Sequence, residues 1–123
     1  MSKKKGKRYL TPEDILSWKD RTEDVEIERG VYVTIRPLTG KMMAKVRNAA
    51  KISSEEDPRH TFDEWVNLWQ IKYALVNPKL SIEQVEELFF YKQVQLVWMI
   101  NRISGMSDEL ANLLRIPLEA RTE

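Results

Sequence analysis

The residues best suited to chemistry lie in one acidic segment, around the only histidine of the chain. His60 follows Glu55, Glu56 and Asp57, and imidazole and carboxylate groups are common metal ligands. No second histidine and no cysteine accompany them, and their spacing matches no calcium-binding loop. The pattern therefore gives metal binding little support.

Enzyme catalysis by the common routes is also disfavoured by the composition. The chain has no Cys, one His and four Gly, and it shows no nucleophile beside a base, no apolar carboxylate pair and no phosphate loop. Acidic residues such as Glu83, Glu86 and Glu87 fall at a helix start, where solvation and the helix dipole explain them. We expect a protein that is not an enzyme and that takes neither a cofactor nor a metal.

The chain is instead rich in aromatic and methionine residues, with four Trp, four Tyr, three Phe and five Met. For any one of them, core packing is the favoured interpretation. Together they can exceed what a small core hides, and wide aromatic surfaces suit the binding of apolar helices. The resulting hypothesis is a protein-binding surface formed by Trp65, Trp69, Phe89, Phe90 and Trp98.

Helices must position most of these rings. Thr11, Thr39, Thr61 and Ser81 each stand where an N-cap belongs, and Ser81 with Gln84 makes a capping box. The helix that starts after Thr61 is predicted to run until Asn77-Pro78. The segment from 82 to 104 is read as one long helix or as two with a break at Phe89-Phe90-Tyr91, and Ser107 is read as the cap of a last short helix.

One segment near the start alternates with the period of a strand. Apolar and polar residues alternate on both sides of Arg29-Gly30, and glycine can adopt the positive φ of a tight turn. We expect a β-hairpin over about residues 24–36. Because an isolated hairpin is marginal in water, its apolar residues are predicted to supply a self-assembly edge, which comprises Val25, Ile27, Val31, Val33 and Ile35.

These elements predict an α+β, mostly helical fold in which the hairpin packs on a bundle of four to six helices. A chain of 123 residues is expected to form a single domain, here over residues 9–117. Residues 1–8 are predicted to form a disordered basic tail and residues 118–123 a flexible end. No apolar run approaches the roughly 20 residues that span a bilayer, so no membrane association is expected.

The order of these elements resembles the tail assembly chaperones of long-tailed bacteriophages and of related prophages in Gram-positive bacteria. The resemblance covers roughly residues 9–110. It rests on "LTPEDIL", on "VEI" followed by "VYVTIRPLTGKMMAKVRNAA", and on "INRISGMSDE". Its most telling pieces are "IRPLTG", at a strand end and helix start, and "ISGMS", at a helix end.

The resemblance implies a non-enzymatic holdase that binds the apolar helical tape measure protein until the tail tube assembles. It implies action in the cytoplasm of the host bacterium and absence from the mature virion. The tail tube protein, a frameshifted longer form of the chain and further copies in a homo-oligomer are candidate partners. The basic tail is not required by the family pattern.

Two alternatives stay open at this point. Five basic residues within the first eight leave 15 basic against 19 acidic residues elsewhere, a net charge of −4. The basic tail and the Lys41–Lys51 helix face would suit a small regulatory protein that contacts nucleic acid, although a solvated tail and face are the favoured interpretation. The second alternative is a structural subunit of the tail or of head completion.

Overall fold

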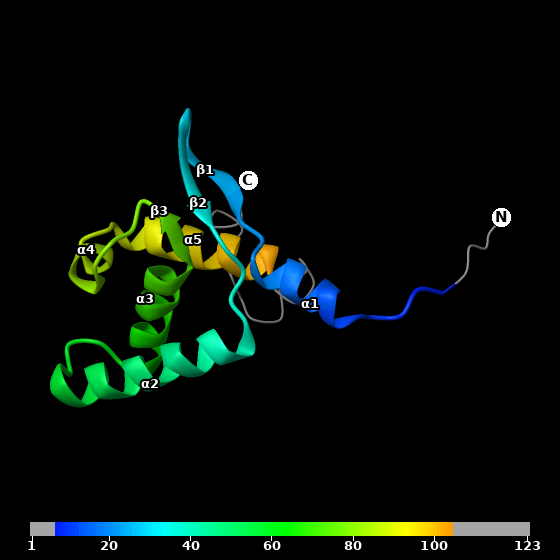
Figure 1. Ribbon diagram of the computed structural model, residues 1–123. Coiled ribbons are helices and arrows are strands. Elements are labelled where there is room, and N and C mark those ends of the chain that lie inside the picture. The colour runs from blue at the N-terminus through cyan, green and yellow to red at the C-terminus, as the bar shows by residue number, and fades with distance from the viewer. Residues whose placement is uncertain (1–6, 105–123) are drawn as a thin grey trace.

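The computed structural model describes residues 7–104 of the chain. This part has five helices and a three-stranded antiparallel sheet, which confirms the predicted α+β, mostly helical class (Figure 1). None of its helices is long and apolar enough to cross a bilayer. The predicted cap at Ser107 and the predicted flexible end at 118–123 lie outside the described residues, as do residues 1–6 of the predicted basic tail.

In chain order the elements are α1 (Pro12–Lys19), β1 (Glu23–Glu28), β2 (Val31–Ile35), α2 (Gly40–Glu56), α3 (Phe62–Ala74), β3 (Leu75–Asn77), α4 (Ile82–Glu86) and α5 (Phe90–Ile103).

Four helices begin at the predicted hydroxyl caps. The side-chain oxygens of Thr11, Thr39, Thr61 and Ser81 each accept a hydrogen bond from the backbone N–H three residues later, at 3.1–3.2 Å. These bonds satisfy donors that the first turn of a helix leaves without an intrahelical partner. The predicted capping box of Ser81 and Gln84 is confirmed.

Strands β1 and β2 form the predicted hairpin. Its turn contains Gly30 at φ +77°, a conformation that glycine adopts without the steric cost of a Cβ. The Glu26 carboxylate accepts a hydrogen bond from the Gly30 N–H at 2.8 Å. A register shift between Glu26 and Glu28 places a bulge just before the turn, and bulges of this kind increase local twist.

Strand β3 corrects the predicted end of the third helix and the predicted two-stranded sheet. α3 ends at Ala74, and Leu75–Asn77 pair with β2 in antiparallel register. The residue before Pro78 is sterically driven to an extended conformation, and pairing with β2 satisfies backbone groups that burial would otherwise leave without partners. The sheet order is β1-β2-β3, so β2 is the central strand.

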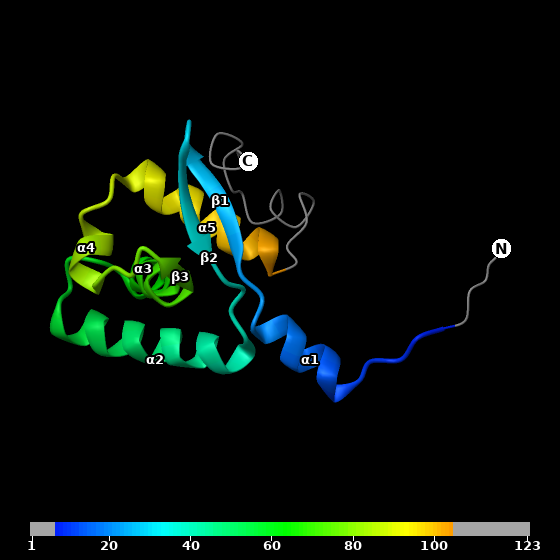
Figure 2. The same ribbon diagram turned by 45° about the horizontal axis from the view of Figure 1, so that its top comes forward.

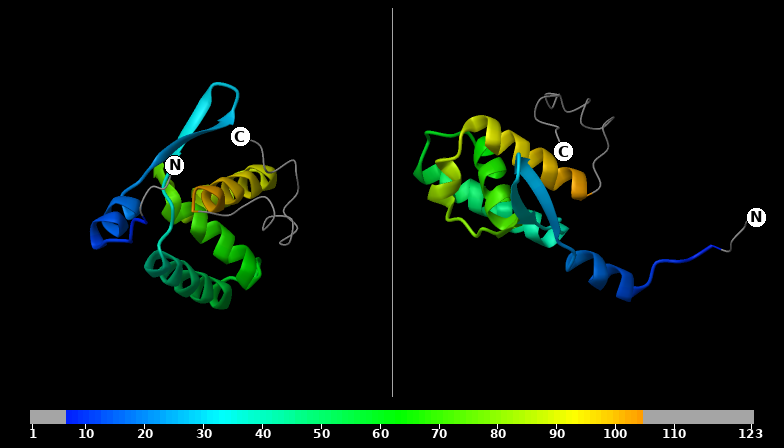
Figure 3. Two further views of the ribbon diagram at one scale, coloured as in Figure 1. Left: turned by 90° about the vertical axis from the view of Figure 1, so that its right-hand side faces the viewer. Right: turned by 90° about the horizontal axis from the view of Figure 1, so that it is seen from above.

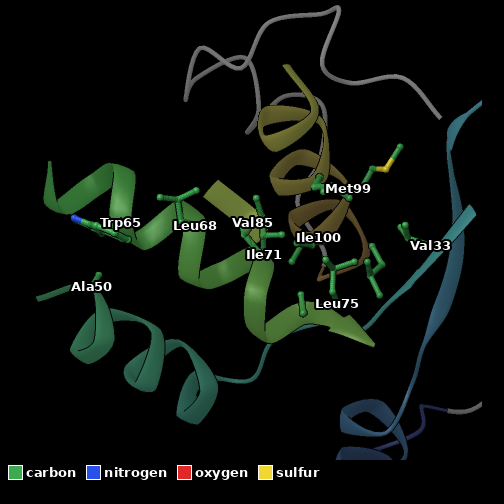
Figure 4. Close-up of a cluster of buried hydrophobic side chains, with 12 residues drawn as sticks. Val33, Ala50, Trp65, Leu68, Ile71, Leu75, Val85, Met99 and Ile100 are labelled. Atoms are coloured by element: carbon green, nitrogen blue, oxygen red, sulfur yellow. The ribbon is translucent and has the colours of Figure 1, made fainter. Parts of the chain in front are cut away.

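Helix α3 is the centre of the core. It stands between α2 and α5, and Figure 2 shows it nearly end-on above α2. It buries both Trp65 and Leu68 and, one turn later, Ile71 and Ala74. Figure 4 shows how side chains from the neighbouring elements meet these residues. The rest of the buried cluster comprises Val33, Ile35, Ala50, Leu75, Val85, Leu96, Met99 and Ile100.

The segment after Ser81 forms two helices, with the break at the predicted aromatic run. α4 ends at Glu86 and α5 begins at Phe90. The Gln93 side-chain amide donates to the carbonyls of Val85 at 3.0 Å and Leu88 at 3.2 Å. These bonds satisfy carbonyls in the connection between the two helices, and they fix the direction in which α5 starts.

Arg36, just after β2, joins the sheet to the end of α3. Its backbone N–H donates to the Ala74 carbonyl and its side-chain Nε donates to the Tyr73 carbonyl, both at 3.0 Å. Carbonyls in the last turn of a helix lack intrahelical donors, and a cation there also interacts favourably with the helix dipole. Arg36 therefore caps α3 from a neighbouring element.

The loop between α2 and α3 is tied to α4 by two side-chain contacts to Glu86. The Arg59 guanidinium donates to the Asp57 carboxylate at 2.6–2.9 Å and lies 3.2 Å from Glu86 in α4. His60 Nε2 lies 3.0 Å from the same Glu86 carboxylate, and the His60 ring meets Trp65 edge-on with ring centroids 4.9 Å apart. Asp57 and His60, both singled out in the sequence, thus belong to a structural clamp between this loop and α4.

Replacing Arg36 with alanine should destabilise the fold. The Arg36→Ala variant leaves the Tyr73 carbonyl without its charged donor, which should lower the free energy of unfolding by about 1–3 kcal/mol. Urea unfolding followed by far-UV circular dichroism measures the change. The matched control Arg47→Ala, on the exposed face of α2, should stay within about 0.5 kcal/mol of the wild type. Equal losses in the two variants would contradict a capping role for Arg36.

The Asp57 contact predicts a loss of stability in acid. Hydrogen bonds from the Arg59 side chain and then from its backbone N–H lower the pKa of Asp57 from 3.8 to about 2. A pKa lowered by folding gives stability that is present above the unfolded value and is lost as pH falls through the folded value. The stabilising contribution of Asp57 should therefore disappear between pH 3.8 and about 2.

Urea midpoints measured from pH 5 to pH 2 test this dependence. The wild type should lose more stability over that interval than Asp57→Asn, because the amide does not titrate. Glu55→Gln, at the exposed end of α2, should follow the wild-type slope. Parallel slopes for the wild type and Asp57→Asn would contradict the prediction. The effect should be modest, since the Arg59 side chain is 67% exposed and water screens the pair.

Candidate protein-binding surface

The acidic segment does not assemble a metal site in the described part of the chain. His60 faces Glu86 and, at 3.7 Å, Glu64, whereas Glu55 and Glu56 point into solvent at the end of α2. Over residues 7–104 no three His, Asp or Glu side chains are placed to hold a metal ion. Within the acidic segment, Asp57 and His60 are engaged in the clamp between the loop and α4.

Two of the five predicted binding residues are core residues. Trp65 is 4% exposed and donates from Nε1 to the Asp57 carbonyl at 3.1 Å, and Trp98 is 1% exposed. Trp65 belongs to the buried core cluster, and burying such large apolar side chains stabilises the fold. In this conformation neither ring is accessible to a partner.

Trp69 occupies an intermediate position. Its ring is half-buried, donates from Nε1 to the Ser53 hydroxyl at 2.9 Å and lies 6.0 Å from the ring of Tyr73. Since the indole N–H already has a partner in α2, Trp69 serves the packing of α2 against α3.

Phe89 and Phe90 lie on the surface. Phe89 is 82% exposed, Phe90 is 77% exposed, and Tyr91 beside them is 46% exposed. We call these three residues the aromatic corner. The corner is held by the residues that follow it, because the Lys92 ammonium donates to the Ile27 carbonyl at 2.7 Å and Gln93 fixes the α4–α5 connection.

A second exposed apolar surface lies on α1, which the sequence analysis did not identify. α1 stands away from the body of the molecule (Figures 1 and 3). Its apolar side chains remain about half exposed, with Ile15 at 50%, Leu16 at 54% and Trp18 at 55%. One feature of the sequence could have indicated this surface. The helix is short and lies between the basic tail and a polar segment, so its apolar residues have no apolar neighbours along the chain to pack on.

A groove runs between α1 and the end of α5. Its volume is about 420 Å³, and among residues 7–104 it is lined by apolar side chains of α1, of the β2–α2 connection and of α5, together with the charged Arg21. The Arg21 guanidinium donates to the Ile103 carbonyl, which holds the two sides together. We call this hollow the arm groove. Its lining comprises Ile15, Trp18, Arg21, Pro37, Leu38, Thr39, Ile103 and Ser104.

The predicted self-assembly edge is only partly available. Val33 is 7% exposed and Ile35 is 0% exposed, because β2 is the central strand and its inner face packs into the core. This corrects their assignment to an open edge. Val25 and Ile27 are half-buried on β1, and Val31, beside the turn, is 46% exposed.

β1 is an outer strand of the sheet that residues 7–104 form, and it is strongly acidic. Four of its six residues are Glu or Asp, in the sequence EDVEIE. Charged side chains on an edge strand oppose pairing with another strand, and two copies joined along β1 would bring these carboxylates together. The acidic composition therefore disfavours β1-to-β1 assembly and leaves side-chain docking on the apolar surfaces as the better-supported mode of binding.

Comparison of the chain with protein-family models, with curated proteins and with solved structures found no significant match.

Proposed function

We propose that this chain is a non-enzymatic protein-binding protein that holds an apolar helical segment of a partner through the aromatic corner. In the form that the sequence resemblance suggests, the partner is a phage or prophage tape measure protein. The chain then acts as a tail assembly chaperone, which keeps the long apolar helices of that protein soluble before the tail tube forms.

The observation that carries the proposal is the exposure of two adjacent phenylalanines. Phe89 and Phe90 leave most of their side-chain surface in water, although the same chain buries Trp65 and Trp98. Neighbouring exposed aromatic rings are a recurrent feature of binding hot spots. A partner helix that covers both rings would remove their apolar surface from water, which gives a favourable hydrophobic contribution to binding.

The corner is also well ordered for binding. Phe89 is extended at φ −54° and ψ 144°, directly before the first turn of α5, and Gln93 and Lys92 anchor that turn to α4 and to β1. A surface that is already held in place loses little conformational entropy on association. This supports direct capture of a partner without prior rearrangement.

Charges surround the corner and limit what it can bind. Lys92 lies 3.5 Å from Glu28, and Glu87 is exposed two residues before Phe89. A polar border of this kind disfavours nonspecific apolar association. It suits an amphipathic helix, which can place its own charged face against the border and its apolar face on the rings.

Coexpression with a fragment of a phage tape measure protein tests the proposal. The wild-type chain should raise the soluble fraction of the fragment. Replacing Phe89 and Phe90 together by serine should weaken the complex by about 30-fold in Kd, as for a hot spot worth at least 2 kcal/mol. Ultracentrifugation of lysates and titration calorimetry of the purified pair measure the two quantities.

The control is Ile52→Ser, which removes a side chain 48% exposed on α2, away from the corner. It should bind as the wild type does, and both variants should keep the wild-type unfolding midpoint. A fragment that is equally insoluble with and without the chain would refute the chaperone function. Retardation of DNA by the chain that falls steeply with salt would instead support the nucleic-acid alternative.

A further inference from the structure

Exposed apolar side chains are concentrated in one short segment, residues 9–18, which we call the apolar arm. Among the described residues, 7–104, twelve large apolar side chains are exposed, and five of these lie in the arm. The five are Tyr9, Leu10, Ile15, Leu16 and Trp18, with exposed fractions from 50% to 76%. The helical part of the arm, α1, stands away from the body (Figures 1 and 3). Apolar surface gathered on a projecting element is typical of an interaction site.

The arm combines an apolar ridge with an apolar hollow. Ile15, Leu16 and Trp18 fall within about half of the helix circumference, and Ser17 falls on the opposite side. Ile15 and Trp18 line the arm groove, while Leu16 lies on the flank of the same apolar half. A second arm could therefore pack along this ridge and reach the hollow beside it.

The charges of α1 favour an antiparallel arrangement of two such arms. The charged residues are Glu13 and Asp14 in the first turn and, at the other end, Lys19, Asp20 and Arg21. Asp14 is already paired with Arg8 of the same chain at 2.9 Å, and Glu13 is exposed. Antiparallel packing places each acidic start beside the net positive end of the other helix and also opposes the two helix dipoles.

An antiparallel pair centred between Ile15 and Leu16 also brings an apolar residue to each arm groove. If Ile15 lies beside Leu16 of the partner subunit, then Leu10, five residues earlier, reaches Arg21 of the partner subunit, five residues later. Arg21 lines the arm groove, so the exposed Leu10 arrives at the groove of the other copy. A two-fold axis repeats this contact, and each copy then supplies both a ridge and a hollow.

We propose that two copies of this chain associate through their apolar arms. The α1 helices lie antiparallel about a two-fold axis, and Leu10 of each copy enters the arm groove of the other. The acidic outer strand β1 opposes assembly along the sheet, whereas the arm offers complementary shape and charge. The proposal does not rest on the proposed chaperone function, because the aromatic corner takes no part in this contact.

Sedimentation equilibrium of the full chain tests the interface. The wild type should be a dimer that dissociates on dilution. Leu16→Glu places a charge near the axis in both copies and should raise the dimer dissociation constant at least about tenfold. Leu10→Glu, which tests the groove, should act in the same direction. The matched control Ile52→Glu replaces a side chain on α2 of similar exposure, 48% against 54% for Leu16, and should dimerise as the wild type does.

Disulfide trapping gives an independent readout, because the chain has no native Cys. Residues near a two-fold axis meet their own copies, so Leu16→Cys should form an interchain disulfide under mild oxidation. Ser17→Cys, on the exposed opposite side of the same helix, should form it at least about tenfold more slowly. Nonreducing gels measure both rates.

Three results would overturn the proposal. They are a wild-type chain that is monomeric at every concentration measured, a dimer that Leu16→Glu leaves intact, and equal disulfide rates for the two cysteine variants. A dimer lost on replacing Phe89 and Phe90 by serine, but kept in Leu16→Glu, would assign the interface to the aromatic corner. Since capture of a tape measure fragment is measured separately, failure of the dimer and failure of the chaperone function are distinguishable.

Discussion

The fold depends on one junction, where α3 stops and its chain continues as β3. Leu75 turns from helix to strand with its own N–H still bonded to the Ile71 carbonyl, and the strand then pairs with β2. Arg36, just after β2, donates hydrogen bonds to two carbonyls in the last turn of α3 and so also stabilises this junction. A hairpin is marginal by itself, so this junction is what makes the sheet part of the core. It also makes β2 the central strand and buries Val33 and Ile35.

The junction determines where the remaining apolar side chains can go. α3 meets α2, α4, α5 and β3, and Trp65 is buried for that reason, whereas Phe62 at the start of the helix stays 41% exposed. α5 crosses beside α3 with Trp98, Met99 and Ile100 inside. Exposed apolar residues remain on α1 and at the start of α5, besides other positions such as Val31 and Ile52. Because these two places are held by different contacts, Arg21 for one and Gln93 for the other, they are separate surfaces.

The features that were predictable from the sequence are local ones. Thr61 as an N-cap and Gly30 in the turn follow from hydrogen bonding and steric properties within a few residues. The strand at Leu75 depends on pairing with a segment about 40 residues earlier. The helical spacing of the apolar residues up to Asn77 therefore predicted the wrong end for α3. Exposure is equally nonlocal. Trp65 and Phe89 are both large aromatics next to helix starts, and only the packing of α3 against α2 and α5 separates the buried ring from the exposed one.

The acidic edge of β1 explains why binding should occur through side chains. An unpaired strand offers backbone donors and acceptors to any extended segment, but the carboxylates of Glu23, Asp24, Glu26 and Glu28 accompany them along β1. The Asp24 carboxylate already accepts a hydrogen bond from the Thr34 hydroxyl at 2.6 Å, and Lys92 occupies the Ile27 carbonyl. Strand addition would have to overcome this repulsion and displace these contacts. Docking on Phe89 and Phe90 requires neither, so an apolar helix is the partner that the surface accommodates at least cost.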